Sequence, residues 1–170
     1  QGAGDILQQH LYAGAIAQGE TLLAARPATD KEAQAALGMT RFVAAMERFG
    51  QGLHRYGLQA PRTMFMPFLS FPVPHNPDPE KITYEKFRAL LATFVADLDA
   101  AQKTLEAVGD APVKIPVDVL KLRIDINGDG KAEESERFVS LFMTAMGGPR
   151  ASGAPVDPGT FPIAFDTADM

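Results

Sequence analysis

Hydrophobic residues recur at helical spacing along most of the chain, and they predict three long helices joined by shorter segments. The first helix begins after Asp5, a good N-cap residue, and ends before Pro27, because proline cannot continue a helix. Its apolar residues lie on one broad helical face: Ile6, Leu7, Leu11, Tyr12, Ile16, Leu22 and Leu23. We expect this face to pack on the core.

The second helix has cap residues at Thr29 and Asp30 and a regular apolar pattern. Spacings of three and four alternate along its apolar residues: Met39, Phe42, Met46, Phe49, Leu53 and Tyr56. Its other side carries Gly38, Gly50 and Gly52, which lower the helix propensity. These glycines indicate that a neighbouring element approaches the helix closely.

The third helix is capped by Thr83 and ends at Gly109. Three-and-four spacing continues along its apolar residues: Tyr84, Phe87, Leu91, Phe94, Leu98, Ala101, Leu105 and Val108. Such a stripe fits packing against the second helix within the chain, or a coiled-coil seam between two chains. The first arrangement is simpler. It predicts an all-α fold, an antiparallel helical bundle.

A proline-rich segment at residues 61–79 separates the second and third helices. It contains a cluster of large apolar residues: Met64, Phe65, Met66, Phe68, Leu69 and Phe71. Proline excludes a helix here, and the segment is too apolar for a free linker. It either covers the helices as a strap or, together with helix 30–58, forms an interaction module for a peptide or protein partner. The strap is the simpler interpretation, because large exposed apolar patches are rare on soluble proteins.

The stretch from Asp125 to Glu136 carries the strongest chemical signal, because it fits the calcium-loop pattern D-x-[DN]-x-[DN]-G-x5-E without a gap. A hard cation needs about six to eight oxygen ligands, and Gly130 supplies the sharp turn that lets one short loop provide them. The expected metal ligands are Asp125, Asn127, Asp129, Lys131 through its main-chain carbonyl, Glu133 directly or through water, and Glu136 as a bidentate ligand.

This loop resembles that of the EF-hand family, which implies Ca²⁺ as the bound ion and a helix on either side. Magnesium, manganese or a lanthanide could occupy the same oxygens. Before the loop, Val117, Leu120 and Ile124 have helical spacing and predict a short entering helix from Pro116. After it, an apolar stripe predicts an exiting helix that ends at Met146: Phe138, Leu141, Phe142 and Ala145.

Several features depart from the paired loops of calcium sensors. Ala132 stands where the family carries Ile, Val or Leu to pair with a second loop, Arg137 replaces an apolar residue at the first exit position, and the motif has no second copy. We therefore expect one helix-loop-helix calcium site with a mainly structural role. Residues 30–58 also faintly resemble a tetratricopeptide repeat through Leu37-Gly38, without a second copy at that period.

Composition argues against several other functions. The formal net charge of −5 and the pI near 5.2 give no basic surface for nucleic acid or anionic membrane, and no apolar run is long enough to span a membrane. The absence of cysteine excludes disulfides and thiolate metal sites. His10, His54 and His75 lie in separate segments, and no nucleophile or phosphate-binding motif is present, so we expect a non-enzymatic protein.

The length of 170 residues suits one domain, which we expect at residues 1–148, followed by an extended Pro/Gly-rich tail at 149–170. Residues 166–169 resemble the cap and first turn of another helix, which suggests a fragment of a longer protein. Weak calcium loops suit places rich in calcium, so the loop favours a bacterial periplasmic or secreted protein over a cytoplasmic one.

Overall fold

The computed structural model describes residues 1–58, 73–138, 140 and 162–166. In chain order, the elements within these ranges are α1 (Ala3–Ala13), α2 (Ile16–Ala24), α3 (Lys31–Arg55), α4 (Tyr84–Glu106), β1 (Lys114–Asp118), the 3-10 turns η2 (Val119–Lys121) and η3 (Glu134–Glu136), and β2 (Pro162–Asp166). The described part of the chain is mostly helical, as the sequence predicts, and it also contains a small antiparallel sheet. None of the helices in these ranges has the length and apolar character needed to cross a membrane.

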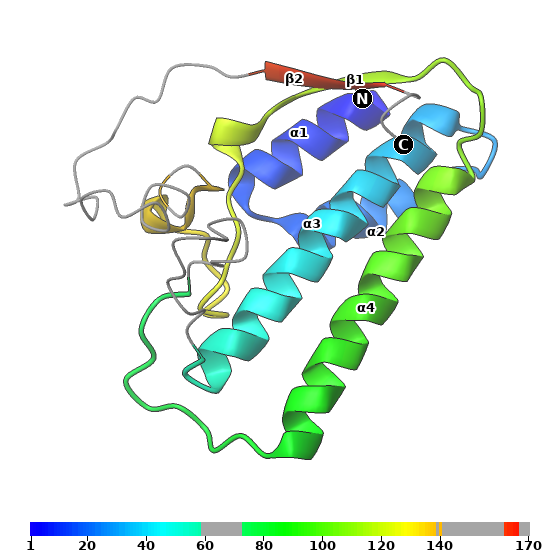
Figure 1. Ribbon diagram of the computed structural model, residues 1–170. Coiled ribbons are helices and arrows are strands. Elements are labelled where there is room, and N and C mark those ends of the chain that lie inside the picture. The colour runs from blue at the N-terminus through cyan, green and yellow to red at the C-terminus, as the bar shows by residue number, and fades with distance from the viewer. Residues whose placement is uncertain (59–72, 139, 141–161, 167–170) are drawn as a thin grey trace.

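The two longest helices, α3 and α4, form an antiparallel hairpin, and α1, α2 and the sheet gather around the N-terminal half of α3 (Figure 1). The main core lies there, where α1, α2 and β1 cover α3 with apolar side chains. Beyond it, the C-terminal half of α3 packs on α4 along one side. A second, smaller cluster forms where the loop after β1 meets α3.

The sequence correctly predicts both long helices and their N-terminal caps. The side chain of Asp30 accepts the main-chain N–H of Ala33 at 3.0 Å, and the hydroxyl of Thr83 accepts that of Lys86 at 3.3 Å. Each cap satisfies one of the amides that a helix leaves without an intrahelical partner. The predicted packing of these two helices within one chain is also confirmed.

Glycines allow α4 to approach α3 closely, as expected. A Cβ atom added at Gly38 would overlap the side chain of Leu105, and one added at Gly52 would overlap that of Leu90. Between these two points the rings of Phe49 and Phe94 stack with centroids 4.3 Å apart. Along the hairpin, contacts between a glycine of α3 and a leucine of α4 therefore lie on either side of a stacked pair of aromatic rings.

The apolar stripe expected on α3 is not its main buried face, and this prediction is wrong in part. Phe42 is 50% exposed, and Met46 is only partly buried. The residues that α3 buries are mostly small: Ala33, Ala35, Ala36, Gly38, Thr40, Ala44, Ala45 and Gly50. Because α1, α2 and α4 surround the helix on several sides, small side chains bring these neighbours within packing distance.

The first predicted helix is in fact two helices. Gly14 takes a left-handed conformation with φ +70°, which ends α1 and lets α2 fold back against it. Such a conformation strains residues that carry a Cβ, so glycine here is a stop signal. Asp5 is not the N-cap either; Gly2 takes that position, and the Asp5 carboxylate accepts its N–H at 3.1 Å.

The entering helix predicted from Pro116 is a strand, so this prediction is wrong. In β1, burial alternates along Lys114–Val117, which is the period of a strand with one covered face. Pro116 does not interrupt the sheet. Its carbonyl points away from β2 and accepts a hydrogen bond from the Gln8 side chain at 2.7 Å. The main-chain groups of a strand residue point the same way, so the missing N–H of this proline faces away from β2.

The strand β2 pairs antiparallel with β1, with Lys114 opposite Asp166 and Asp118 opposite Pro162. The sequence places this segment in a tail and does not anticipate the pairing. The apolar cluster of the proline-rich segment and the exiting helix beyond Ser140 lie outside the described residues. The described end of the proline-rich segment, residues 73–79, is fastened to α3, because the Asn76 side chain donates to the His54 carbonyl at 2.8 Å.

Candidate metal loop

The twelve-residue loop projects from the end of the sheet and lies beside α1 and the C-terminal half of α3 (Figure 1). Main-chain bonds join its two ends: Ile124 N–H donates to the Glu136 carbonyl at 3.2 Å, and Phe138 N–H donates to the Leu122 carbonyl at 2.8 Å. A β-bridge between Arg123 and Arg137 accompanies them. The loop is therefore closed by antiparallel pairing, and the expected helix on its entering side is absent.

Side-chain oxygens inside the loop accept hydrogen bonds from loop amides. The Asp125 carboxylate accepts from Gly128 and Gly130 N–H groups at 2.8 and 2.9 Å. Asn127 Oδ1 accepts from Asp129 N–H, and Asp129 Oδ1 from Lys131 N–H, each at 2.8 Å. This repeating pattern winds the backbone tightly around the side chains predicted as ligands.

Glu136 reaches back across the loop and is buried, with 3% of its surface exposed. Its Oε1 accepts from the Ile126 and Asn127 amides at 3.0 and 3.1 Å, and its Oε2 accepts from the Glu133 amide at 3.0 Å. One carboxylate thus joins the beginning of the loop to its end. This is the position at which the sequence predicts the closing bidentate ligand.

Two glycines make the tight winding possible. Gly128 and Gly130 have φ angles of +74° and +84°, in the left-handed region that favours glycine. The sequence assigns the bend to Gly130 alone, and the structure adds Gly128 two residues earlier. The Asp125 carboxylate bonds to the N–H of both residues, so the bends and the first predicted ligand form one unit.

The helix α3 holds the loop through Asp125, which the sequence does not reveal. Glu47 Oε2 accepts the Asp125 N–H at 2.9 Å, and Gln51 Nε2 donates to the Asp125 carbonyl at 2.8 Å. These two side chains are four residues apart and so lie one above the other on the helix. Their only sequence signal is that spacing.

Apolar contacts fix the rest of the loop. Ile124 and Ile126, on either side of Asp125, are buried and pack against the partly buried side chains of Val43 of α3 and Val73. On the other side of the loop, a Cβ atom added at Gly14 would overlap that of Ala132. Ala132, at the position where paired sensor loops carry a larger apolar residue, instead packs on the end of α1.

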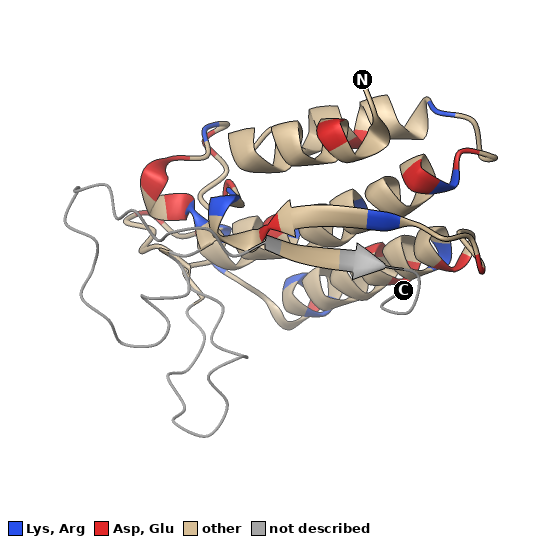
Figure 2. Ribbon diagram, turned by 90° about the horizontal axis from the view of Figure 1, so that it is seen from above, with Lys and Arg blue, Asp and Glu red and all other residues tan. Residues whose placement is uncertain are grey.

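Acidic residues gather at the end of the loop, where Figure 2 shows red ribbon at η3. Burial raises the pKa of Glu47 to about 7. The hydrogen bond from Asp125 N–H opposes this rise, and the negative charges of Asp125 and Glu136 add to it. Burial also raises the pKa of Glu136, against three amide hydrogen bonds that lower it. The loop therefore accumulates negative charge that its surroundings only partly stabilise.

The predicted ligands fit calcium in chemistry, since all offer oxygen. Asp125 and Glu136 lie buried, whereas the side chains of Asp129 and Glu133 are exposed. Within the described residues, no three His, Cys, Asp or Glu side chains are grouped so that they could hold a metal ion. A full coordination shell would thus require Asp129 and Glu133 to turn inward, and would add the oxygens of Asn127 and of the Lys131 main chain.

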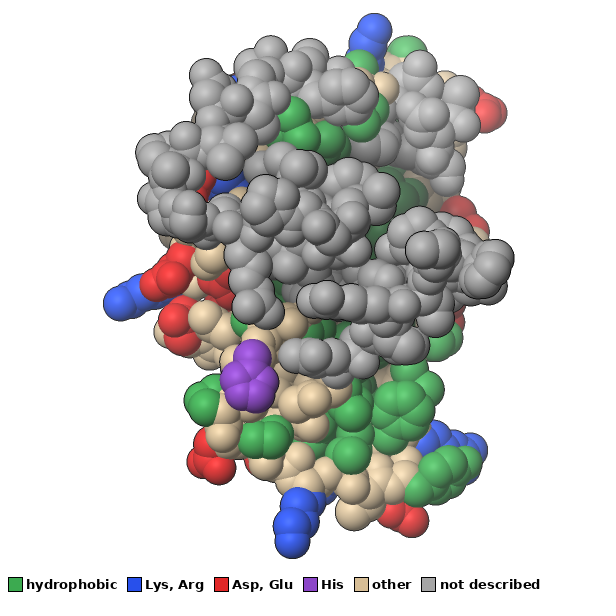
Figure 3. All heavy atoms as spheres, turned by 60° about the vertical axis from the view of Figure 1, so that its left-hand side comes forward, with side chains coloured by type: hydrophobic (Ala, Val, Ile, Leu, Met, Phe, Trp, Pro, Cys, Tyr) green, Lys and Arg blue, Asp and Glu red, His purple; other side chains and the backbone are tan. Residues whose placement is uncertain are grey.

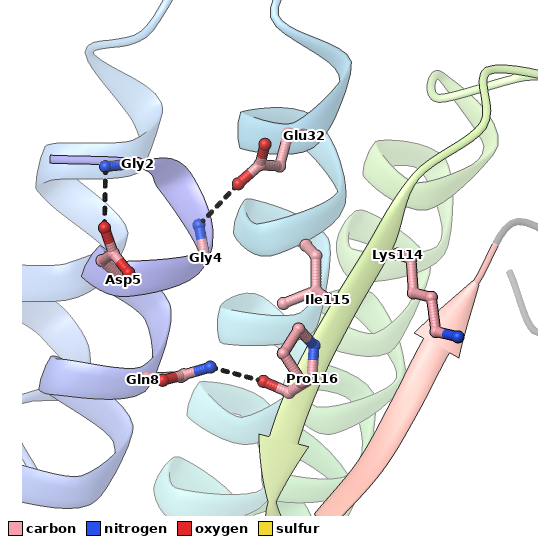
Figure 4. Close-up of a pocket in the computed structure, with 8 residues that line it drawn as sticks. All are labelled: Gly2, Gly4, Asp5, Gln8, Glu32, Lys114, Ile115 and Pro116. Carbon is pink, nitrogen blue, oxygen red and sulfur yellow. Dashed lines mark hydrogen bonds between the residues drawn. The ribbon is translucent and has the colours of Figure 1, made fainter.

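A separate shallow pocket of about 180 Å³ lies between α1, α3 and β1 (Figure 4). Its polar groups already bond to each other: Gly4 N–H donates to Glu32 at 3.0 Å, and Gln8 donates to the Pro116 carbonyl at 2.7 Å. The Lys114 side chain points away from the Asp5 carboxylate (Figure 4). These contacts fasten α1 to its neighbours, which is a structural role.

Comparison with known proteins gives no relative for this chain. No protein-family model matches it, and neither a curated protein nor a solved structure does.

Proposed function

We propose that this protein binds Ca²⁺ through residues 125–136 and that the ion has a mainly structural role. The observation that carries the proposal is the winding of the loop around its own oxygen-bearing side chains, closed by the buried Glu136. Both Asp125 oxygens, Asn127 Oδ1 and Asp129 Oδ1 each accept a single main-chain N–H and keep a lone pair for a cation. Glu136 Oε1 accepts two amides and would have to release one of them to bind the ion as half of a bidentate carboxylate. The ligands would be those predicted from the sequence: Asp125, Asn127, Asp129, Lys131 through its carbonyl, Glu133 and Glu136.

Charge supplies the driving force. Asp125 and Glu136 lie close enough to raise the pKa of Glu47, so these carboxylates repel one another in a partly buried place. A divalent cation at the loop would neutralise this repulsion. The flanking charges Arg123 and Arg137 do not serve this purpose, because both pair with Glu134 on the outside of η3.

A structural role follows from how firmly the loop is attached. Calcium sensors respond by changing the angle between two helices that flank the loop. Here β1 and the short turn η2 precede the loop, the bridge between Arg123 and Arg137 closes it, and Glu47 with Gln51 fixes it to α3. Binding is therefore expected to raise the free energy of unfolding without a large rearrangement.

Thermal unfolding with and without a calcium chelator tests the proposal. A ligand at about 100 times its Kd adds roughly 2.7 kcal/mol to the unfolding free energy. For a chain of this size we expect the Tm to rise by roughly 5–10 °C in calcium. An unchanged Tm at millimolar calcium would contradict the proposal.

A matched pair of variants locates the effect. Glu136→Gln removes the closing carboxylate and should abolish most of the calcium-dependent Tm rise. Glu106→Gln makes the same chemical change at an exposed position of α4, remote from the loop, and should leave the rise intact. Isothermal titration calorimetry on both variants separates loss of binding from loss of folding.

A further inference from the structure

The helix α4 is apolar on two adjacent faces, and only one of them packs on α3. The face toward α3 carries Leu90, Phe94, Ala101 and Leu105. The neighbouring face carries Tyr84, Phe87, Leu91, Val95 and Leu98, spaced three and four residues apart. On this second face Val95 is 56% exposed, Leu91 40% and Phe87 39%. We call it the outer face of α4.

The outer face continues onto α3. Phe42 is exposed and lies two turns before Phe49, which stacks on Phe94, so Phe42 borders the α4 side of its helix. Hydrophobic side chains are also visible at the end of the molecule where α3 ends and α4 begins (Figure 3). Several large apolar side chains in a row on one hairpin are unusual for a surface that stays in water.

We propose that the outer face of α4 binds the outer face of a second copy of this chain, antiparallel, so that two α3–α4 hairpins form a four-helix bundle. Charges at the edge of the face identify the occupant. Arg88 and Asp99 are both exposed, and both lie on the edge of the outer face that is turned away from α3. A second copy related by a two-fold axis would bring each Arg88 opposite the Asp99 of the other copy.

Apolar and charged residues agree on the same register. In an antiparallel pair, Leu91 would lie opposite Val95 of the other copy and Phe87 opposite Leu98. Both pairs, and the pair of Arg88 with Asp99, place the two-fold axis within about half a residue of Thr93, at the 1.5 Å rise of a helix. One axis thus satisfies all three pairs at once.

The charge pattern also selects the direction of pairing. In a parallel pair related by a two-fold axis along the helices, the edges that carry Arg88 and Asp99 would lie on opposite sides of the seam, so these charges would have no opposite charge from the other copy beside them. The antiparallel arrangement brings the two edges together on one side of the seam and forms two attractive pairs of Arg88 with Asp99. A surface that is complementary to itself in shape and charge is what a symmetric homodimer requires.

Sedimentation equilibrium of the purified chain between about 1 and 100 μM tests the proposal, with dimers expected. Leu91→Glu and Val95→Glu place a charge in the seam and should each weaken dimerisation at least tenfold. Ala96→Glu puts the same charge on the exposed back of α4 and should not. A monomer throughout this range, or dimers that Leu91→Glu leaves intact, would overturn the proposal.

A mixing experiment tests the register and needs no buried substitution. Arg88→Asp copies carry acidic groups at both edge positions, and Asp99→Arg copies carry basic groups at both, so each variant alone should dimerise at least several-fold more weakly. When the two variants are mixed, every edge pair is again attractive, and heterodimers should form as tightly as the parent dimer. No gain in association on mixing would rule out the antiparallel register.

Discussion

The carboxylate of Glu47 accepts a hydrogen bond from the main-chain N–H of Asp125 at 2.9 Å, so α3 holds the first residue of the loop through its backbone. Gln51 Nε2 donates a hydrogen bond to the carbonyl of the same residue at 2.8 Å. The Asp125 side chain is thereby left to bond inside the loop. Because one helix holds both main-chain groups of one loop residue, substitutions on α3 should affect the loop without touching any predicted ligand.

Glu47→Ala should destabilise the protein more than Glu47→Gln does. The alanine variant leaves the buried Asp125 N–H without an acceptor, which costs roughly 1–3 kcal/mol. The glutamine variant keeps an acceptor oxygen and removes a charge that Asp125 and Glu136 oppose, so in a calcium chelator it should be at least as stable as the parent. Urea unfolding in chelator measures both. Equal losses would show that the hydrogen bond is not what matters.

Gly14→Ala should be much more harmful than Gly109→Ala. Both glycines have left-handed φ angles, +70° and +65°, so alanine costs roughly 1–2 kcal/mol of backbone strain at either position. At Gly109 nothing lies near the added Cβ, whereas at Gly14 it would overlap Ala132. The difference between the two unfolding free energies, expected at about 1–3 kcal/mol, measures how tightly the loop packs on α1.

A loss of calcium affinity should accompany Gly14→Ala and not Gly109→Ala. Displacing Ala132 moves the loop backbone between Lys131 and Glu133, two predicted ligands. Calorimetric titration of both variants checks this. If Gly14→Ala is destabilised but binds calcium as the parent does, the contact with α1 supports the fold and not the loop geometry.

Within α3, Gly38→Ala should destabilise and Gly52→Ala should be nearly neutral. A Cβ atom at Gly38 would lie 2.6 Å from Leu105 Cγ and 3.2 Å from its main-chain nitrogen, so α4 itself must move. At Gly52 the closest atom is the end of the Leu90 side chain, which can rotate away. We expect a loss of about 1–3 kcal/mol at Gly38, whereas the gain in helix propensity offsets the contact at Gly52. Thermal unfolding distinguishes the two.

These contacts show which parts of the fold the sequence could predict. Local signals identified the N-terminal ends of α3 and α4, because the Asp30 and Thr83 caps act within a few residues of themselves. The partner of each helix face could not be derived in the same way. Phe42 is exposed although it lies on the regular stripe, since the side of α3 that meets three neighbours is made of small residues.

The strand before the loop was not predicted either, because its structure also depends on a distant part of the chain. Val117, Leu120 and Ile124 have helical spacing, but the pairing of β1 with a segment almost fifty residues later decides the structure there. In the loop itself, the pattern from Asp125 to Glu136 supplied the predicted ligands. It could not supply Glu47 and Gln51, because residues that hold a loop from another element leave no mark at a fixed spacing from it.

Asp129→Ala should weaken calcium binding, whereas Lys131→Ala, two residues away on the loop, should not. The Asp129→Ala variant loses a charged ligand, so its calcium affinity should fall at least tenfold, which corresponds to about 1.4 kcal/mol of binding free energy. Lys131 would contribute only its main-chain carbonyl, and its side chain is exposed, so alanine removes a positive charge and should leave the affinity unchanged or slightly higher. Calorimetric titration compares them at one ionic strength. An equal loss in Lys131→Ala would mean that this lysine side chain, and not its carbonyl, supports the loop, and the ligand set proposed from the sequence would be wrong at that position.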